Sequence, residues 1–271
     1  MSGNKFLTGK TAIVTGASRG IGLAIAEGFA KAGANVSIAS RNKSELLKVQ
    51  QRLKTFNANV RAIATDVSKS KDVDALVDQT LKSFGNVEIL VNNAGCFKEL
   101  ALVPFPDQVL RPPAVMRSSN QRMTDDEFRE IIDTNIGGVF YGCRAVAPIM
   151  MNKGYGKIIN ISSVAGTKAY KLEAVYDSSK SAINMLTRCL ALEWAPYGIR
   201  VNSLAPGDYI TSMTSDAWKD PLRKENYLKS IPLSQAGDMD GLVSLAMFLA
   251  SPESDYITGQ TINIDGGLSA E

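Results

Sequence analysis

Residues Thr11 to Gly22 read Thr-Ala-Ile-Val-Thr-Gly-Ala-Ser-Arg-Gly-Ile-Gly. The run up to Thr15 is apolar and β-branched and is closed by a glycine, a pattern typical of a short buried strand. Apolar residues then recur at helical spacing from Gly20 to Ala32. The stretch therefore predicts a strand, a glycine-rich turn and a helix in direct succession.

The glycine-rich turn lies at the N-terminus of the predicted helix, where free backbone N–H groups and the helix dipole suit a phosphate group. Glycine is needed in such a turn because a Cβ atom would block the approach of the backbone to a pyrophosphate. The alternative is that these glycines only turn the chain. The candidate binding residues of the turn are Gly16, Ser18, Arg19, Gly20, Ile21 and Gly22.

The second predicted strand, Asn35 to Ser40, is followed by Arg41, and the nearest acidic residue is Glu45. A dinucleotide-binding fold that prefers NAD usually places an acid near this point to bind the ribose 2′-hydroxyl. An acid would repel a 2′-phosphate, whereas Arg41 and Arg19 can clamp one beside Ser40. We therefore predict a preference for NADP(H), with NAD(H) possible. The alternative is that both arginines point into solvent.

The rest of the chain alternates strand patterns with helix patterns. Further strands are predicted at 60–65, 87–91, 157–162, 199–204 and 261–264, and helices at 68–84, 124–151, 175–194 and 238–249. This alternation favours a parallel sheet joined by right-handed crossovers. We predict a single α/β domain over residues 1–271, a Rossmann fold whose doubly wound parallel sheet of about seven strands has helices on both faces.

In such a sheet, ligands bind at the carboxyl ends of the strands. Asp66 follows one predicted strand and either accepts a hydrogen bond from an adenine amino group or caps the next helix. Asn92 to Gly95 follows another and either lies beside a bound dinucleotide or forms a plain turn. The further candidates at these two strand ends are Val67, Asn93, Ala94 and Gly95.

Two segments break the regular pattern. Residues 96–123 contain four prolines and little periodicity, which predicts an irregular insertion, either solvated or forming a lid. Residues 208–230 are mixed in character and carry aromatic side chains, which suits a segment that covers a substrate. An ordinary helical hairpin is the alternative for the second segment.

Composition excludes several classes of protein. The chain has no histidine, which excludes serine-histidine triads, histidine relays and the common histidine-containing zinc sites. The net charge of +3 gives no indication of a nucleic-acid or membrane partner. The three cysteines lie far apart without Cys-x-x-Cys spacing, so we expect neither disulfides nor a metal site. With no signal-peptide pattern at the N-terminus, we expect a cytoplasmic protein.

Tyr176 and Lys180 are four residues apart in a predicted helix and share one face. An ammonium favours a nearby phenolate, so Lys180 is expected to lower the pKa of Tyr176 and make it a general acid/base. Ser163 follows a predicted strand and can hydrogen-bond the same reacting oxygen. Asn135 lies in the apolar pattern of a helix, where it either organises a water near that oxygen or only kinks the helix. An ordinary surface pair is the alternative for Tyr176 and Lys180.

These motifs, in this order and spacing, resemble the short-chain dehydrogenase/reductase family over nearly the whole chain. The matching features are Thr15 to Gly22, Asp66, Asn92 to Gly95, Asn135, Ser163, Tyr176-x-x-x-Lys180, Pro206-Gly207 with Thr211, and Asp265 to Gly267. The general look is nearest to 3-oxoacyl-carrier-protein reductases, gluconate dehydrogenases and similar alcohol dehydrogenases.

The resemblance implies an NAD(P)-dependent oxidoreductase that acts on a ketone or a secondary alcohol. It implies a catalytic tetrad in which Tyr176 exchanges a proton with the reacting oxygen and Ser163 holds that oxygen. Lys180 would bind the nicotinamide ribose and join a proton relay through water held by Asn135. The resemblance also implies cofactor contacts from Pro206, Gly207 and Thr211, and a homotetramer that packs through the helices around Asn135 and Tyr176.

Three other readings stay open at this point. One is an NAD(H)-dependent secondary-alcohol or sugar-acid dehydrogenase of the same family. A second is an enoyl reductase, which ranks lower because the pattern of those enzymes spaces tyrosine and lysine more widely than Tyr176 and Lys180. A third is a catalytically silent NADP(H)-binding sensor, which would need a broken tetrad, whereas all four positions are filled.

Overall fold

Seven parallel strands form one sheet in the order β3-β2-β1-β4-β5-β6-β7. The computed structural model describes residues 6–56, 59–104 and 122–270. The strands are β1 (Thr11–Thr15), β2 (Asn35–Ser40), β3 (Val60–Ala64), β4 (Ile89–Asn92), β5 (Gly156–Ile161), β6 (Ile199–Pro206) and β7 (Thr261–Ile264). This order reverses between β1 and β4, which is the switch point at which doubly wound sheets bind ligands. The predicted fold class is confirmed.

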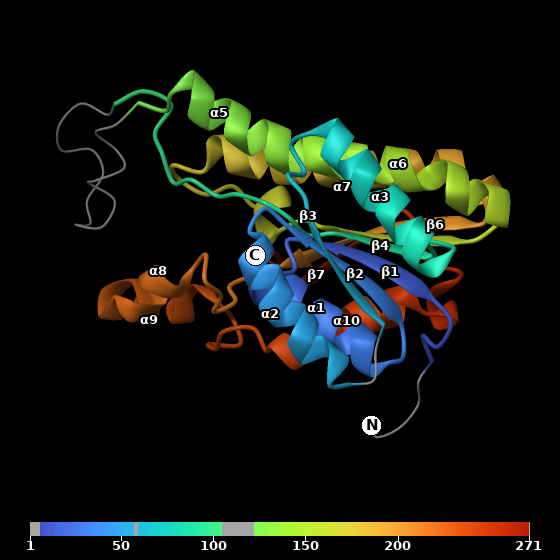
Figure 1. The fold of residues 1–271 in the computed structure, drawn as a ribbon. Coiled ribbons are helices and arrows are strands. Elements are labelled where there is room, and N and C mark those ends of the chain that lie inside the picture. The colour runs from blue at the N-terminus through green and yellow to red at the C-terminus, as the bar shows by residue number, and fades with distance from the viewer. Residues whose placement is uncertain (1–5, 57–58, 105–121, 271) are drawn as a thin grey trace.

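Helices cover both faces of the sheet (Figure 1). One face carries α1 (Gly20–Lys31), α2 (Lys43–Lys54) and α10 (Met239–Ala250). The other carries α3 (Ser70–Phe84), α5 (Asp125–Ile132), α6 (Gly138–Lys153) and α7 (Ala174–Trp194). Two short helices, α8 (Ser215–Lys219) and α9 (Pro221–Ser230), project beyond the edge of this three-layer stack.

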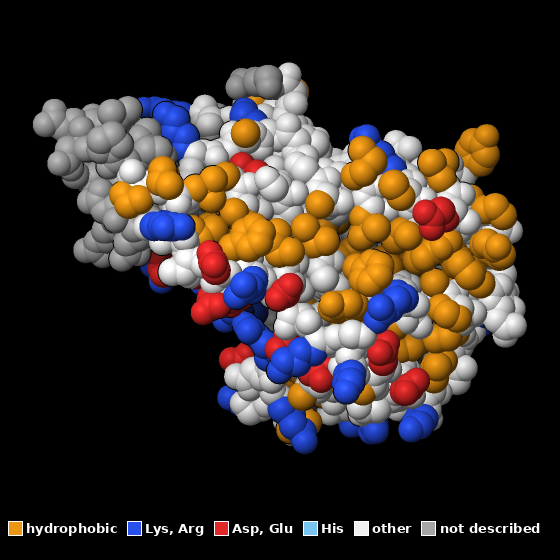
Figure 2. All heavy atoms as spheres, turned by 90° about the horizontal axis from the view of Figure 1, so that it is seen from above, with side chains coloured by type: hydrophobic (Ala, Val, Ile, Leu, Met, Phe, Trp, Pro, Cys, Tyr) orange, Lys and Arg blue, Asp and Glu red, His pale blue; other side chains and the backbone are white. Residues whose placement is uncertain are grey.

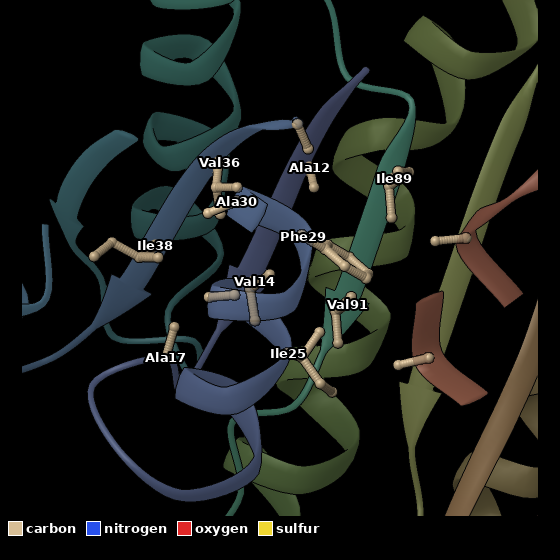
Figure 3. Close-up of a cluster of buried hydrophobic side chains, with 14 of the residues drawn as sticks. Ala12, Val14, Ala17, Ile25, Phe29, Ala30, Val36, Ile38, Ile89 and Val91 are labelled. Atoms are coloured by element: carbon tan, nitrogen blue, oxygen red, sulfur yellow. The ribbon is translucent and has the colours of Figure 1, made fainter. Parts of the chain in front are cut away.

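The core lies on both sides of the central strands. All five side chains of β1 are buried, because successive Cβ atoms point to opposite faces and both faces are covered. Ala12 and Val14 pack on the α1 side against Phe29, as Figure 3 shows, whereas Ile13 packs on the α3–α6 side. The near-continuous apolar run that predicted this strand is therefore a consequence of burial on two faces.

Helix α2 was not among the predicted elements. It begins at Lys43, after Asn42, whose side-chain oxygen accepts hydrogen bonds from the backbone N–H groups of Ser44 and Glu45. Its buried side chains are Leu46, Val49 and Leu53, at helical spacing on one face. Asparagine followed three residues later by glutamate was the signal for this helix.

The helix predicted at 124–151 is not one continuous α-helix. Its start is confirmed, since Thr124 and Glu127 form a reciprocal capping box. At Asp133–Gly137 the chain makes a π-helical turn before α6 continues to Lys153. Asn135 lies in that turn and is 1% exposed. The interruption has a polar cause, because the Asn135 side chain hydrogen-bonds the backbone of Cys96.

The two irregular segments differ in the structure. Residues 96–104 follow β4 and pair with residue 122 through one bridge at Ala101, whereas residues 105–121 of the predicted insertion lie outside the described residues. The segment at 208–230 contains α8 and α9, as the hairpin interpretation expected. The rings of Trp218 and Tyr227 pack together between these two helices, with centroids 5.5 Å apart.

Candidate active site

A cavity of about 420 Å³ opens at the carboxyl ends of the strands, within the size range of roughly 300–1,000 Å³ that is usual for ligand pockets. It gathers almost every predicted site residue, from elements far apart in the sequence. Those residues are Gly16, Ser18, Arg19, Gly20, Ile21, Ser40, Arg41, Asp66, Val67, Asn93, Ala94, Gly95, Ser163, Tyr176, Lys180, Pro206, Gly207 and Thr211. Gly22 and Asn135 are predicted residues that lie behind its wall.

The glycine-rich turn forms one end of the cavity. Gly20 has φ +57°, and a Cβ added there would meet only the Thr211 side chain, at 3.7 Å, so the backbone borders open space. Gly22 serves packing instead, because a Cβ there would lie 2.3 Å from the side-chain nitrogen of Asn93. Asn93 donates from that nitrogen to the carbonyls of Thr15 and Gly16, which fixes the turn against the end of β4.

Thr15 is a site-shaping residue that the predicted site left out. Its hydroxyl accepts hydrogen bonds from the backbone N–H groups of Asn93, at 3.0 Å, and Ala94, at 3.1 Å. It thereby joins the ends of β1 and β4 at the switch point. A threonine directly before the first glycine of the turn was the available signal.

Charged side chains border the part of the cavity next to β2 and β3. Arg19 and Arg41 are both exposed and both line the cavity. Asp66 caps the following turn, since its Oδ1 accepts from the backbone N–H and the hydroxyl of Ser68. Burial would raise the pKa of Asp66, but the Ser68 hydrogen bonds and the nearby Lys69 and Arg41 hold it below its ordinary value. Asp66 therefore caps the turn that follows it, which is one of the two predicted roles, and it also lines the cavity.

Tyr176 and Ser163 meet at the opposite end of the cavity. Ser163 follows β5, and its Oγ accepts from the backbone N–H of Ala165, at 3.2 Å. Tyr176 lies in the first turn of α7, and a hydrogen bond joins its side chain to that of Ser163. This places a phenol and a second hydroxyl together where a reacting oxygen can bind.

Lys180 lies one turn further along α7 and is 5% exposed. Its Nζ is 5.6 Å from the centroid of the Tyr176 ring and donates to the carbonyl of Ile161, at 2.9 Å. Burial lowers the pKa of Lys180 to about 8. A buried amine with an accessible pKa is a recognised feature of functional sites.

The expected fall in the pKa of Tyr176 is not found in the chain without cofactor. Burial raises its pKa above the usual value of 10.0, the Ser163 hydrogen bond opposes this, and Glu173 and Asp177 add to the increase. Helical spacing gave the correct neighbour but not the depth of the phenol, which decides the direction. Lys180, itself weakened as a cation by burial, does not reverse it.

Asn135 holds two segments together behind the cavity. Its Oδ1 accepts from the backbone N–H of Cys96, at 2.9 Å, and its Nδ2 donates to the Cys96 carbonyl, at 3.0 Å. The same Nδ2 donates to the Ser179 hydroxyl, which in turn donates to the carbonyl of Tyr176. A Cβ added at Gly95 would lie 3.3 Å from Asn135 Oδ1 and 3.8 Å from Lys180 Nζ, so these three residues are neighbours.

The described ranges also contain no group of three or more histidine, cysteine, aspartate or glutamate side chains arranged to hold a metal ion. None of the helices in the described part of the chain has the length and apolar character needed to cross a membrane. The cavity, by contrast, fits a dinucleotide: its glycine turn offers open backbone, and arginine side chains border the cavity at that turn and after β2.

Known proteins resemble this chain over nearly all of its length. A family model described as Enoyl-(Acyl carrier protein) reductase matches residues 16–269. The 3beta-hydroxysteroid dehydrogenase 1 of Eggerthella lenta is 37% identical over 265 residues, which is 97% of this chain and 95% of that protein. The 3-oxoacyl-[acyl-carrier-protein] reductase FabG of Chlamydia muridarum is 36% identical over 267 residues, 98% of this chain and all of that protein.

Solved structures agree with this relationship. A gluconate 5-dehydrogenase from Burkholderia cenocepacia, in complex with NADP and tartrate, superposes with a TM-score of 0.87 at 34% identity, covering 99% of this chain and 98% of that one. The motifs and the cavity geometry point the same way as these matches. The chain belongs to the short-chain dehydrogenase/reductase family, NAD(P)-binding oxidoreductases that act on CH–OH or ketone groups of small molecules.

Proposed function

We propose that this chain is an NADP(H)-dependent oxidoreductase that interconverts a ketone and a secondary alcohol, with Tyr176 as the general acid/base. The observation that carries the proposal is the arrangement at the end of β5 and the start of α7. There, a phenol, a serine hydroxyl and a buried ammonium share one end of the cavity that carries the glycine-rich turn at its other end. The tetrad positions are all filled, which argues against a silent NADP(H)-binding sensor.

The chemistry divides between cofactor and chain. Hydride chemistry is supplied by the nicotinamide cofactor when it is bound. The chain has to place the substrate oxygen, exclude water and move one proton at that oxygen. In our proposal Ser163 holds the oxygen, Tyr176 gives or takes the proton, and Lys180 binds the ribose and supports the phenolate. Asn135 keeps α7 and the turn after β4 in register for these contacts, in addition to holding a water of the relay.

The two directions of the reaction require different protonation states of Tyr176. In the chain alone, burial holds the phenol protonated, which is the state required of an acid that protonates a carbonyl oxygen. For the reverse reaction the phenolate has to form. We propose that a bound cofactor with its positive charge and ribose hydroxyls, together with Lys180, brings the pKa of Tyr176 down. Cofactor binding and proton transfer are then coupled.

The NADP(H) preference rests on the arginines. Arg19 and Arg41 both border the cavity, at the glycine turn and after β2, and Ser40 lies beside them. Glu45 also borders it, as the single acid in that part of the lining besides Asp66. Two guanidinium groups offer the bidentate donors that a 2′-phosphate accepts. The cavity residues that we assign to the cofactor are those predicted from the sequence, with Val67 and Asn93 to Gly95 along the adenine and ribose, and Pro206, Gly207 and Thr211 towards the nicotinamide.

Enoyl reduction is the second candidate, because the matching family model carries that description. Tyr176 and Lys180 are one helical turn apart, and the Lys180 ammonium lies 5.6 Å from the centroid of the Tyr176 ring. The wider spacing typical of enoyl reductases is absent, which favours carbonyl chemistry. A 2-enoyl thioester in the substrate panel separates the two.

Two surfaces extend the proposal. We propose that residues 208–230, with α8 and α9, cover the substrate, since the loop leading into α8 borders the cavity at Thr211 to Thr214.

We also propose a homotetramer. Figure 2 shows hydrophobic side chains gathered across the face formed by α5, α6 and α7, where the exposed apolar side chains include Phe128, Phe140, Met185 and Leu192. The single-domain organisation and the cytoplasmic location predicted above remain part of this proposal.

The test is an assay of nicotinamide oxidation at about 340 nm, the absorbance of the reduced cofactor. NADPH and NADH are compared against 3-ketosteroids, 3-oxoacyl thioesters, keto-sugar acids and 2-enoyl thioesters. We expect turnover of one carbonyl class with NADPH favoured over NADH. Turnover of the enoyl thioester alone would replace the proposed reaction, and tight NADPH binding without turnover of any substrate would support the sensor.

A further inference from the structure

Phe97 contacts the ring of Tyr176 edge-on. The ring centroids are 4.9 Å apart and the ring planes make an angle of 85°. Cys96 and Tyr176 border the cavity, whereas Phe97 is not among the lining residues. Phe97 therefore contacts the phenol ring from outside the lining of the cavity, and no motif predicted this contact.

The backbone on both sides of Phe97 is anchored. Asn135 binds both the N–H and the carbonyl of Cys96. On the other side, Lys98 Nζ lies 2.8 Å from a carboxylate oxygen of Glu130 on α5. Glu99 pairs with Arg223 on α9, at 2.8 Å, and the N–H of Leu100 donates to the Leu172 carbonyl, also at 2.8 Å. A side chain held between such fixed neighbours has little freedom to shift.

Tyr176 is held by three further contacts. Its backbone carbonyl accepts from Ser179, whose hydroxyl accepts from Asn135, so the residue that fixes Cys96 also fixes the first turn of α7. Ser163 hydrogen-bonds the phenolic end, and Lys180 lies over the ring at 5.6 Å. Without Phe97 the residue would keep these contacts but would lose the edge-to-face contact on the side of residue 97.

We propose that Phe97 is a positioning residue that sets the orientation of the Tyr176 ring and keeps water from that side of it. The inference rests on the proposed function of Tyr176 as general acid/base. Edge-to-face aromatic pairs have a preferred geometry, and a reacting group displaced by about 1 Å can lose roughly a hundredfold in rate. A leucine at this position is apolar but lacks the ring edge that defines the angle.

The kinetic test compares Phe97→Leu, Phe97→Tyr and Phe56→Leu with the unmodified protein. Phe56 is a partly buried phenylalanine that packs on the other side of the sheet against the α1 core cluster, so Phe56→Leu controls for the loss of a ring as such. We expect Phe97→Leu to lower kcat roughly tenfold, with KM for NADPH within about twofold, since only proton transfer is misaligned. Phe97→Tyr keeps the ring, so its kcat should stay within about threefold of that of the unmodified protein. Phe56→Leu should keep kcat.

The pH profile separates positioning from general destabilisation. Burial is the main cause of the raised pKa of Tyr176, and Glu173, Asp177 and Cys96 raise it further. Phe97→Leu reduces only the burial, so the limb of the alcohol-oxidation profile that reports the phenolate should move to lower pH. Phe97→Leu with unchanged kcat and an unmoved limb overturns the proposal, and so does an equal loss of kcat in Phe56→Leu.

Failure of this inference is distinguishable from failure of the proposed function. If Tyr176→Phe retains turnover, the acid/base assignment is wrong whatever Phe97 does. If Tyr176→Phe is inactive and Phe97→Leu is normal, only the positioning role is wrong. A melting-temperature cycle of Phe97→Leu, Tyr176→Leu and the double variant reads the contact without any substrate: losses smaller than additive support the contact, and additive losses overturn it.

Discussion

Two lysines are buried at opposite ends of strand β5, with different partners. Lys157, near the start of the strand, is 1% exposed, and its Nζ lies 2.7 Å from Asp255 Oδ1 and 3.0 Å from the Ser254 hydroxyl. Lys180, packed against the end of the strand, donates to the Ile161 carbonyl at 2.9 Å. Among the described residues, no carboxylate forms an ion pair with Lys180. Burial lowers the pKa of both lysines, and that of Lys180 to about 8.

The difference separates a structural charge from a functional one. A buried charge with a partner is compensated, whereas a buried charge without one lowers stability and persists where chemistry requires it. The same contrast holds along the two edges of the sheet. At the amino edge, Glu88 accepts from the Thr11 N–H and from Asn86, and pairs with Lys153. At the carboxyl edge, polar groups face an open cavity.

The largest effect is expected from Tyr176→Phe, which removes the proton-transferring hydroxyl at the carboxyl edge. General acid/base catalysis contributes about 10²- to 10⁴-fold, so kcat should fall by that amount while the Kd for NADPH stays nearly unchanged. Steady-state assays and fluorescence titration check the two halves. The control is Tyr155→Phe, since the buried Tyr155 hydroxyl has no hydrogen-bond partner among the described residues and lies at the amino edge. A Tyr176→Phe protein with most of its turnover would contradict the assignment.

Asp255→Ala should harm stability without harming catalysis. It leaves the Lys157 ammonium buried without its carboxylate, and we expect a loss of about 2 kcal/mol, below the roughly 3–5 kcal/mol of a fully buried pair because Asp255 is half exposed. Urea unfolding measures the loss. The control is Asp216→Ala, which breaks an exposed pair with Lys219 and should cost under about 0.5 kcal/mol. Equal losses in the two variants would remove the contrast between the sheet edges.

Arg41→Asp tests the cofactor end of the carboxyl edge. Replacing one guanidinium by a carboxylate should weaken NADPH binding roughly tenfold, as expected for a partly exposed charge-assisted contact, and leave NADH nearly unaffected. Isothermal titration with both cofactors measures the change. Lys48→Asp makes the same charge change on the exposed side of α2, away from the cavity, and controls for long-range charge. Equal losses for NADPH and NADH would refute a contact with the 2′-phosphate.

The smallest effect is expected from Glu99→Gln, which breaks the ion pair to Arg223 between the segment after β4 and α9. Both side chains are partly buried, so the substrate KM should rise roughly two- to fivefold. High salt should raise the wild-type KM and leave that of the variant unchanged. Glu225→Gln, which breaks the exposed pair with Lys229 on α9 itself, is the control. If the substrate KM changes neither in Glu99→Gln nor with salt, this ion pair has no role in covering the substrate.

The fold was predictable because its signals are local. Short apolar runs indicate the strands, and the capping pair Thr124 and Glu127 indicates the start of α5. Helix α2 was overlooked because only one face carries apolar side chains and the rest of it is polar. The π-helical turn had no local signal, since its cause is the contact of Asn135 with Cys96, 39 residues away.

The site was predictable in composition but not in electrostatics. The order of the motifs predicted a set of site residues, and all of them line the cavity except Gly22 and Asn135. The direction of the Tyr176 pKa shift depends on how deeply the phenol is enclosed, which spacing along a helix does not encode. Phe97 carries no motif at all, and only the folded chain brings its ring against Tyr176.

The most direct test of the contrast is Lys180→Met, followed by activity and by stability as a function of pH. Folding lowers the pKa of Lys180 from 10.5 to about 8, which corresponds to a cost of roughly 3 kcal/mol. The unfolded state holds the proton more tightly, so this cost is fully present below about pH 8 and is relieved as pH rises towards 10.5.

We predict that Lys180→Met loses turnover, melts roughly 5 °C higher at neutral pH, and lacks the gain in unfolding free energy that Lys180 gives the wild type between pH 8 and 10.5. A variant that keeps its turnover, melts lower than the wild type and shows the same pH dependence would contradict the account.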